Sequence, residues 1–446
     1  MIRNLFDKVY GNIVVLGNLS GQRRIPYAST EELCKLRNTR LQNIVNYAAK
    51  TVPYYQDLFK TIKIHPSEIR SVEDLEGLPL VEKEMLRKDP AYFISRSRKG
   101  MNAIPFLTSG STGMPTKIYH DRYSLLANIA SGEREREVIS KFCGRSFGYT
   151  IAFLFPPEST TKKVQELYRR WTFIPIRPGQ FELSLLSPVE EVIESINRVR
   201  PDALIGYASY LETLFRTLSS RRISIHSPKV VVSLAEAMTP EGKTLIEEEF
   251  GIPVISQYNA MEAFKIGFTC EKRKGFHLHE DLCHVQIVGA NGKKMTDGEK
   301  GEIVISNLVN HGTVLLNYRL GDVGALSREK CPCGRTLPLL SELGGRTEDI
   351  LLLPNGRFIH PRAIWGAIKH AEGVLRYQFI QHEPKRFELR LVTVDKDTYL
   401  RIVDTILDGL KNILGTSVMI ESQYVAEIKP QEGGKFRPVL SLCKPR

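Results

Sequence analysis

The chain lacks any run of about 18 apolar residues, the length that a membrane-spanning helix needs. Near its N-terminus it holds only one short apolar segment, Ile13–Leu16, which is too brief for the core of a secretory signal peptide. Its seven cysteines are odd in number and unevenly spaced, which argues against a secreted disulfide framework and leaves metal binding open. We therefore expect a cytoplasmic protein with no transmembrane segment.

The sequence also lacks internal repeats, low-complexity segments, zinc-finger spacing and any basic–aromatic repeat. We therefore expect no nucleic-acid partner, although the formal net charge is +12. A basic surface of this kind suits anionic cofactors such as a nucleotide or coenzyme A. At 446 residues, with 42% hydrophobic and 25% charged residues, the chain has an ordinary globular composition and is too long for one domain.

The most informative stretch is Leu107–Lys117, which reads LTSGSTGMPTK. Glycines at Gly110 and Gly113 allow a backbone bend that points several N–H groups into one concavity. Hydroxyl donors and the Lys117 charge accompany them, so the loop suits a polyanion such as a nucleoside triphosphate. It is not a Walker loop, because Met114 and Pro115 follow Gly113. A polar surface turn is the alternative for such a cluster.

Residues 121–260 alternate helical and strand patterns, which predicts a parallel sheet built from βαβ units. Ligands in such sheets lie beyond the carboxyl ends of the strands, so the turns after Leu234 and Gln257 are the places to examine. The predicted elements are helices at 29–51, 124–140, 189–199, 210–219 and 240–250, and strands at 149–155, 203–206, 229–234 and 254–257.

From about residue 283 the pattern becomes rich in strands, predicted at 284–288, 301–306 and 314–317, with turns at Asn291-Gly292 and Asp297-Gly298. The last hundred residues mix both patterns, with elements predicted at 350–353, 362–370, 388–393 and 399–410. The sequence therefore predicts two domains, residues 1–346 and residues 347–446.

Several motifs occur in an order that is similar to the adenylate-forming (acyl-adenylate synthetase) superfamily. They are Thr108–Lys117, Leu234-Ala235-Glu236-Ala237, Tyr258-Asn259-Ala260-Met261-Glu262, Tyr318-Arg319-Leu320-Gly321-Asp322, Gly345-Arg346-Thr347-Glu348-Asp349 and Gly434-Lys435-Phe436-Arg437. Further segments resemble the phenylacetate–CoA ligase and CapK-like branch, namely Tyr54-Tyr55, Ile205–Ser209 and Cys331-Pro332-Cys333-Gly334-Arg335. The resemblance covers about residues 30–440. It implies a large N-terminal α/β domain with a β-rich subdomain, and a small mobile α+β C-terminal domain.

The resemblance also implies an activity, in which a carboxylic acid and ATP give acyl-AMP and pyrophosphate, and coenzyme A then accepts the acyl group. The phosphate-binding loop, with Thr108, Ser109, Gly110, Ser111, Thr112, Gly113 and Lys117, would hold the β- and γ-phosphates, and Ala235 and Glu236 would line the adenine pocket. Tyr258 would stack on adenine beside Asn259, Asp322 would accept the ribose hydroxyls, and Arg346 would contact the nucleotide. Glu262 would hold Mg²⁺ and Lys435 would bridge the carboxylate and the α-phosphate.

Simpler roles and other functions remain open at this point. Taken alone, Asp322 could be a turn residue and Glu262 a helix cap. Asn259 and Met261 replace a glycine and a hydroxyl residue of the family motif, and Glu348 replaces the hinge aspartate. The alternatives are a CapK-like ligase that uses an amine or hydroxyl acceptor, and a catalytically weakened nucleotide-binding protein. The sequence names neither the acid nor the oligomeric state. Walls of the acyl pocket are expected from scattered residues such as Tyr207, Ala235 and Gln257.

A second candidate site combines cysteine and histidine residues. Cys270, His277, Cys331 and Cys333 form a ligand set of three sulfurs and one imidazole, which suits a structural Zn²⁺ ion. Some phenylacetate–CoA ligase-like proteins carry cysteines near this place. His279 is the alternative fourth ligand, and buried free cysteines are the alternative to a metal site.

Overall fold

The computed structural model describes residues 2–108, 116–155, 159–175, 179–184, 187, 189–234, 237–346, 351–354, 358–359, 364, 367–368, 371–429 and 437–443. The described helices are α1 Ile2–Leu19, α2 Thr30–Thr51, α3 Pro53–Ile62, α4 Lys83–Lys88, α5 Arg98–Met101, α6 Arg122–Ser131, α7 Glu133–Cys143, α8 Thr160–Trp171, α9 Val189–Val199, α10 Ala208–Arg221, α11 Pro240–Thr244 and α13 Lys396–Leu414. None of the helices in these ranges is long and apolar enough to cross a membrane.

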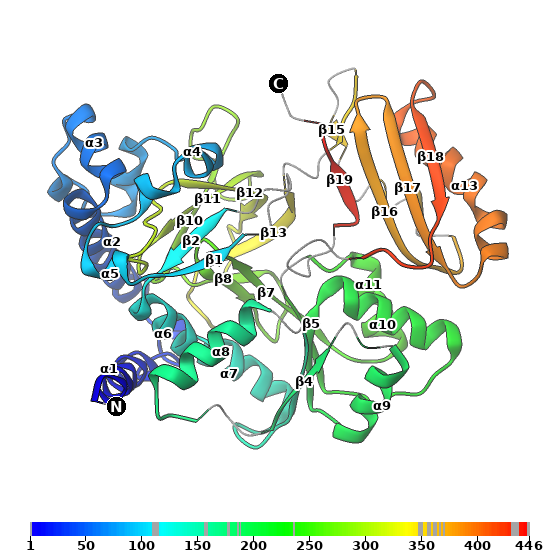
Figure 1. Ribbon diagram of the computed structural model, residues 1–446, viewed down its shortest axis with the longest axis horizontal. Helices are drawn as coiled ribbons and strands as arrows, with labels where there is room; N and C mark the ends of the chain where they lie inside the picture. The colour runs from blue at the N-terminus through cyan, green and yellow to red at the C-terminus, as the bar shows by residue number, and fades with distance from the viewer. Residues whose placement is uncertain are drawn as a thin grey trace.

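One mixed sheet of 11 strands organises most of the chain, in the order β10-β11-β12-β13-β9-β8-β7-β6-β5-β3-β4 (Figure 1). Its strands are β3 Ile151–Phe155, β4 Gln180–Ser184, β5 Ala203–Tyr207, β6 Val230–Leu234, β7 Val254–Ala260, β8 Phe264–Thr269, β9 Phe276–Leu278, β10 Cys283–Val288, β11 Gly301–Asn307, β12 Tyr318–Leu326 and β13 Leu339–Arg346. Strands β3 to β7 are parallel, as the βαβ pattern predicts. Strand β7 is also antiparallel to β8, so it joins the parallel part to the β-rich part.

Helices cover both faces of the parallel strands because these strands are apolar on both faces. Val138 and Ile139 of α7 pack with Ile205 on one face, whereas α9 and α10 pack against Leu204 on the other. Successive strand residues point to opposite faces, so neighbouring residues of β5 enter different cores. This arrangement leaves the carboxyl ends of β6 and β7 at the same edge of the sheet.

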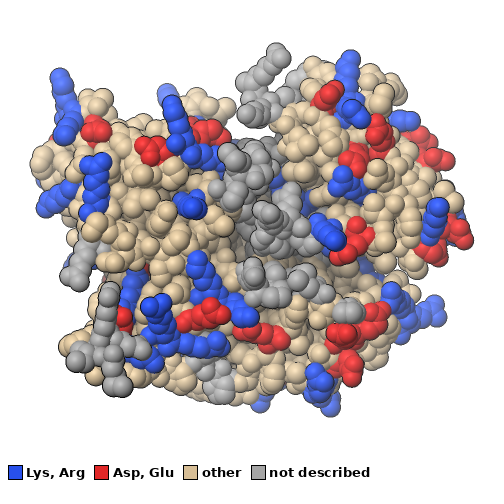
Figure 2. Space-filling model, viewed as in Figure 1, with Lys and Arg blue, Asp and Glu red and all other residues tan. Residues whose placement is uncertain are grey.

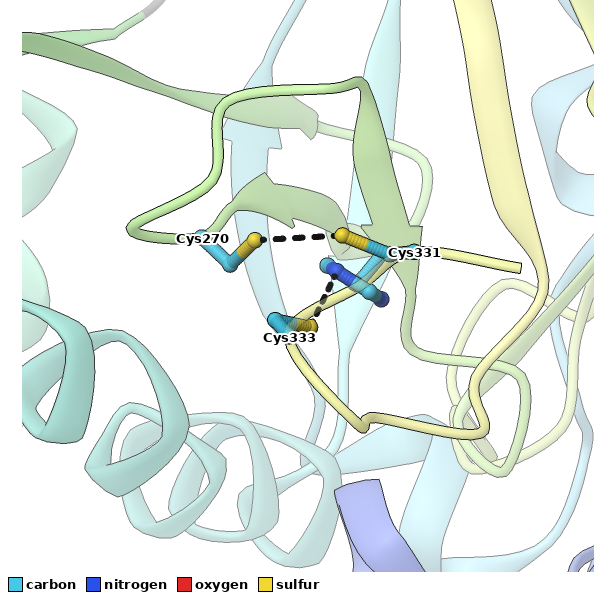
Figure 3. Close-up of side chains that lie close together, drawn as sticks. Cys270, Cys331 and Cys333 are labelled. Atoms are coloured by element: carbon cyan, nitrogen blue, oxygen red, sulfur yellow. Dashed lines mark hydrogen bonds between the residues drawn. The ribbon is translucent and has the colours of Figure 1, made fainter. Parts of the chain in front are cut away.

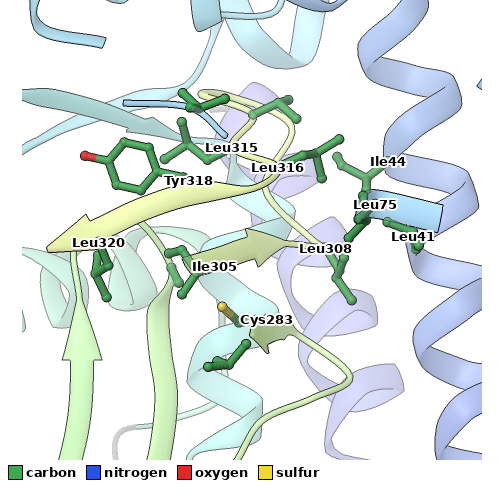
Figure 4. Close-up of a cluster of buried hydrophobic side chains, with 14 of the residues drawn as sticks. Leu41, Ile44, Leu75, Cys283, Ile305, Leu308, Leu315, Leu316, Tyr318 and Leu320 are labelled. Carbon is green, nitrogen blue, oxygen red and sulfur yellow. The ribbon is translucent and has the colours of Figure 1, made fainter. Parts of the chain in front are cut away.

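A second core lies between the N-terminal helices and the β-rich part of the sheet. Figure 4 shows Leu41 and Ile44 of α2 beside Leu308 and Leu316, which lie far away in the sequence. Helix α2 begins where the sequence predicts, since Ser29 and Glu32 form the two reciprocal hydrogen bonds of a capping box.

Three predicted elements differ in the structure. The helix predicted at 124–140 is two helices, α6 and α7, that meet at Gly132, because glycine is a poor helix former. Of the helix predicted at 240–250, only Pro240–Thr244 is α-helical, and Leu245–Glu249 form a π-helical turn. Residues 314–317 are buried but form no strand, and Asn317 has a φ of 52°. Helix α1 was not predicted.

The C-terminal residues form a separate sheet in the order β18-β17-β16-β19, covered by α13 and supported by its own apolar core (Figure 1). Its strands are β16 Val374–Glu383, β17 Arg386–Thr393, β18 Met419–Tyr424 and β19 Val439–Ser441, and a hairpin of β14 Leu351–Leu352 and β15 Phe358–Ile359 precedes them. Strand β16 lies against α10 of the large body. Burial and the carboxylates of Glu212 and Glu241 raise the pKa of Tyr377 at this contact.

Candidate functional site

The structure brings Tyr258 and Asp322 together from strands that are far apart in sequence. Tyr258 is near the end of β7 and Asp322 lies on β12, and the tyrosine hydroxyl donates a hydrogen bond to Asp322 Oδ2 at 2.7 Å. Both residues are 6% exposed, so the pair is held inside the body. The backbone of Arg346 lies opposite Asp322 in the β12–β13 register, which places the predicted hinge motif beside the same aspartate.

Glu262 lies in the turn between β7 and β8 and is 6% exposed. Its carbonyl accepts a hydrogen bond from Asn307 at 3.0 Å, and its Oε1 lies 3.5 Å from the Tyr318 hydroxyl. The second distance is longer than an ordinary O–H···O hydrogen bond of about 2.5–3.0 Å, so the carboxylate keeps lone pairs for a cation. The element that follows Glu262 is strand β8, so Glu262 is not the cap of a helix.

The two departures from the family motif have structural roles in this turn. With its amide nitrogen facing the main chain, Asn259 donates to the carbonyls of Tyr258 and Phe264, both at 3.1 Å. Asn259 thus stabilises the turn in which Phe264 adopts a φ of 61°. Met261 packs its side chain among apolar neighbours, while its carbonyl accepts a hydrogen bond from His120 Nε2 at 2.7 Å.

The predicted phosphate-binding loop is closed at its base by two threonines. Strands β1 Ile104–Leu107 and β2 Lys117–His120 pair antiparallel, with Leu107 opposite Lys117. The Thr108 amide donates to the Thr116 carbonyl at 2.9 Å, and the Thr116 amide donates to Thr108 Oγ1 at 3.0 Å. Because His120 ends β2 and bonds to Met261, this hairpin is fixed to the turn that carries Glu262.

Several predicted site residues lie outside the described residues. They are Ser109, Gly110, Ser111, Thr112, Gly113, Ala235, Glu236, Glu348 and Lys435. Lys117 is described and exposed at the start of β2, and Ala235 and Glu236 follow the carboxyl end of β6 in sequence.

A cavity of about 1130 Å³ extends from the sheet to α1. Gln257, the residue before Tyr258, lies in its wall, whereas Tyr207 is not among the described residues that line it. Most of its walls are apolar, and they include residues that the sequence motifs did not indicate: Val15, Leu19, Ile129, Ile139, Phe153, Val164 and Tyr168. Lys265 and Glu135 face the same cavity and form an ion pair, and the charged residues Arg23, Arg24, Glu133 and Arg136 also line it.

A buried charge cluster behind this cavity was also missed by sequence reasoning. Arg134 forms a bidentate ion pair with Asp281 at 2.7 and 2.9 Å, and both side chains are fully buried. Burial raises the pKa of Asp281, but Arg134 and Arg40 outweigh burial and hold it well below its ordinary value. His279 lies in this cluster, 3.2 Å from Glu135 and 3.1 Å from Arg134. The alternative that His279 is a metal ligand is therefore wrong.

The other four predicted zinc ligands do come together (Figure 3). Cys270 follows β8, His277 lies in β9, and Cys331 and Cys333 lie between β12 and β13. Their ligand atoms all lie within 4.8 Å of one another; Cys270 Sγ is 3.6 Å from Cys331 Sγ, and Cys333 Sγ is 3.4 Å from His277 Nε2. A tetrahedron with metal–sulfur bonds of about 2.3 Å has edges of roughly 3.8 Å, so the set fits a Zn²⁺ ion.

Backbone and side-chain donors support these sulfurs. The amides of Lys272 and Arg335 donate to the sulfurs of Cys270 and Cys333 at 3.3 and 3.4 Å. Burial raises the pKa of the Cys333 thiol, but the hydrogen bonds of Arg335 outweigh it and lower this pKa overall. Burial raises the pKa of the Cys270 thiol to about 12 and also raises the pKa of the Cys331 thiol, so among the three cysteines these donors favour the thiolate, the form that binds a metal, at Cys333.

The arrangement matches known proteins in fold and in sequence. Residues 351–441 match the CapK C-terminal domain. The chain has the fold of adenylate-forming ligases: a crystal structure of 2-hydroxyisobutyryl-CoA ligase in the postadenylation state, in complex with R3-HIB-AMP, aligns with a TM-score of 0.74 and 20% identity, covering 94% of this chain and 91% of that one.

Curated relatives agree with this class along almost the whole length. Phenylacetate-coenzyme A ligase of Thermus thermophilus is 25% identical over 450 residues, which cover 93% of this chain and 97% of the relative. The enzyme of the same name from Pseudomonas putida is 26% identical over 446 residues, covering 91% of this chain and 93% of the relative. The predicted resemblance to adenylate-forming ligases of the phenylacetate–CoA ligase and CapK branch is confirmed.

The buried imidazole of His120 predicts a pH dependence of stability. Burial lowers the pKa of His120 to about 4, and its Nδ1 has no hydrogen-bond partner within the described ranges. As pH falls below about 6.5, the unfolded chain binds a proton that the folded chain excludes, so stability falls until pH reaches about 4. The loss from this group is on the order of 3 kcal/mol.

Urea unfolding between pH 7 and pH 4 measures this effect. The variant His120→Gln keeps a donor for the Met261 carbonyl but does not titrate. We expect it to be less stable at pH 7, because packing against Phe106 and Phe264 is lost, yet to show a flatter pH dependence. If stability fell equally with pH in the wild type and in His120→Gln, the pH dependence would not come from His120.

Proposed function

We propose that this chain is an ATP-dependent ligase that converts a carboxylic acid to acyl-AMP and then transfers the acyl group to coenzyme A. The observation that carries the proposal is the juxtaposition of Tyr258, Asp322 and Glu262 beside the β1–β2 hairpin, at the carboxyl end of β7. An aromatic ring, a carboxylate for two hydroxyls and a carboxylate for a cation are what a nucleotide with Mg²⁺ requires.

Each residue has a defined part in this proposal. ATP, when bound, supplies the α-phosphorus that the carboxylate attacks and the pyrophosphate that leaves. Asp322 accepts the ribose hydroxyls, and its hydrogen bond with Tyr258 orients the ring for stacking on adenine. Glu262 holds Mg²⁺, which offsets the repulsion between the two anions that must meet. Thr108 and Thr116 hold the ends of the loop whose N–H groups and hydroxyls would receive the phosphates.

We propose that the 1130 Å³ cavity receives the acyl group. Its position beside Gln257 places it next to the proposed adenine site, and its apolar walls favour the hydrocarbon part of an acid. Lys435 and Arg346 belong to the proposal through the family resemblance: the lysine would bridge the carboxylate and the α-phosphate, and the arginine would contact the nucleotide. We further propose that residues 347–446 act as a mobile lid that carries Lys435.

Acid-dependent release of pyrophosphate tests the proposal. A panel of aryl and alkyl carboxylic acids is incubated with the protein, ATP and Mg²⁺, with and without coenzyme A. We expect release with some acids, and Lys435→Ala should lower its rate by about 10²- to 10³-fold. Lys429→Ala, which removes an exposed lysine shortly before the motif, is the matched control and should retain the rate.

The outcomes separate the alternatives. Coenzyme A consumption supports the thioester product, whereas pyrophosphate release without it favours an amine or hydroxyl acceptor. ATP binding with no release for any acid would favour a weakened nucleotide-binding protein, for which the replacement of a hydroxyl residue by Met261 is the structural reason. Full activity of Lys435→Ala would remove that lysine from the mechanism.

We also propose that Cys270, His277, Cys331 and Cys333 hold a structural Zn²⁺ ion. The four ligands leave no open position for a substrate, which is the arrangement of structural sites. The ion would connect the turn after β8, strand β9 and the β12–β13 connection, and so would support the strand that carries Asp322 from behind.

A further inference from the structure

Helix α1 exposes a stripe of apolar side chains along its length. Leu5, Phe6, Val9, Ile13 and Leu16 are 56, 70, 44, 66 and 59% exposed. Their spacing of three, four and seven residues places them on one face of the helix. Among the described side chains of α1, this stripe contains no charged group, since Asp7 and Lys8 lie nearer the protein.

The opposite face fixes the helix on the protein. Asp7 forms an ion pair with Arg122 at 2.7 Å, and Asn12 Oδ1 accepts a hydrogen bond from the Phe173 amide at 3.0 Å. A Cβ at Gly11 would collide with the main chain of Trp171, so the glycine permits a close approach to the end of α8. These contacts prevent α1 from rotating about its axis, so the apolar stripe stays exposed to solvent.

Positive charge flanks the stripe. Helix α8 packs beside α1 and exposes four basic residues, Lys162, Lys163, Arg169 and Arg170. Its one acidic residue is Glu166. Arg23 and Arg24 are exposed just after α1. In the space-filling view, several Lys and Arg side chains lie over α8, with Asp and Glu side chains among them, at the side of the body where α1 lies (Figures 1 and 2). Phe173, which is 54% exposed, adds an aromatic ring to the same surface.

We propose that this surface, the α1 stripe with the basic flank of α8, binds an anionic lipid bilayer. Apolar side chains on one face of a helix enter the region between headgroups and acyl chains, and neighbouring cations pair with anionic headgroups. Because its inner face is attached to α6 and α8, α1 lies along the bilayer surface. A twofold dimer through the stripe would bring the same cations of two copies together, which disfavours a second copy as the occupant.

Vesicle sedimentation tests the proposal with the full chain. We expect binding to vesicles of phosphatidylcholine mixed with phosphatidylglycerol, weak binding to phosphatidylcholine alone, and release as salt is raised. Ile13→Asp should weaken binding at least about tenfold, because a large apolar side chain leaves the bilayer. Leu400→Asp on α13 makes the same charge change at a residue that is 59% exposed and should bind as the wild type does.

A second measurement does not depend on loss of function. The variant Phe6→Trp places an indole in the stripe, and its emission should shift to shorter wavelength with the anionic vesicles and be quenched by brominated acyl chains. No binding to anionic vesicles at low salt would overturn the proposal, as would equal losses in Ile13→Asp and Leu400→Asp. A dimer in solution that Ile13→Asp dissociates, without vesicle binding, would assign the stripe to a second copy.

Discussion

Replacing Asp322 by alanine is expected to weaken AMP binding by about two to four orders of magnitude. The buried carboxylate would accept both ribose hydroxyls, and each hydrogen bond to a charged group contributes roughly 1.5–3 kcal/mol. Asp322→Asn keeps one acceptor oxygen and should lose less. Isothermal titration of AMP into each variant measures the effect directly, without an acid substrate.

Tyr258→Phe is the matched control for this experiment. It removes the hydroxyl that donates to Asp322 at 2.7 Å but retains both the ring and the carboxylate. We expect a change of about tenfold or less in AMP affinity. If Asp322→Ala bound AMP as the wild type does, the aspartate would be a structural partner of Tyr258 and nothing more.

Loss of the proposed metal is expected to have the largest effect on stability. Three elements separated in sequence meet at Cys270, His277, Cys331 and Cys333, so the binding energy of the ion is also folding energy. We expect elemental analysis to find zinc in the purified protein. Cys331→Ser, or removal of the ion by a chelator, should lower stability by on the order of 5 kcal/mol and the melting temperature by about 10 °C.

Cys34→Ser supplies the comparison, because Cys34 lies on α2 outside the ligand set. It should retain zinc and melt with the wild type. Replacement of the ion by Co²⁺ should give a thiolate-to-metal absorption band that Cys331→Ser weakens. Metal-free wild-type protein that melts at the same temperature with and without chelator would contradict the assignment and leave three free cysteines and a histidine.

Local patterns predicted the fold well wherever one short segment determines its own structure. The capping box of Ser29 and Glu32 fixes the start of α2, and helix α9 has the predicted bounds. The prediction of a strand at 314–317 was wrong because its apolar residues suggest a strand, whereas their side chains fill the core beneath α2. Helix α1 was missed because its apolar residues occur on both faces, so no simple amphipathic pattern marks it.

The candidate site was predictable only as far as motifs extend. Residues such as Tyr258, Glu262 and Asp322 belong to recognisable strings, and the structure places them together. The cavity walls and the Arg134–Asp281 pair come from residues whose role depends on distant partners. No spacing in the sequence reports that Val15 and Gln257 line the same cavity, because only the folded sheet brings them together.

The core beneath α2 has a consequence for synthesis of the chain. Leu41 and Ile44 pack against Leu315 and Leu316, which a ribosome adds much later (Figure 4). At a synthesis rate of about 5–20 residues per second, the apolar face of α2 lacks these packing partners for roughly 15 to 60 seconds. During that interval strands β3 to β7 can already pair with one another, since they are neighbours in sequence. Chaperones that shield apolar helices should therefore engage the nascent N-terminal region until β12 has emerged.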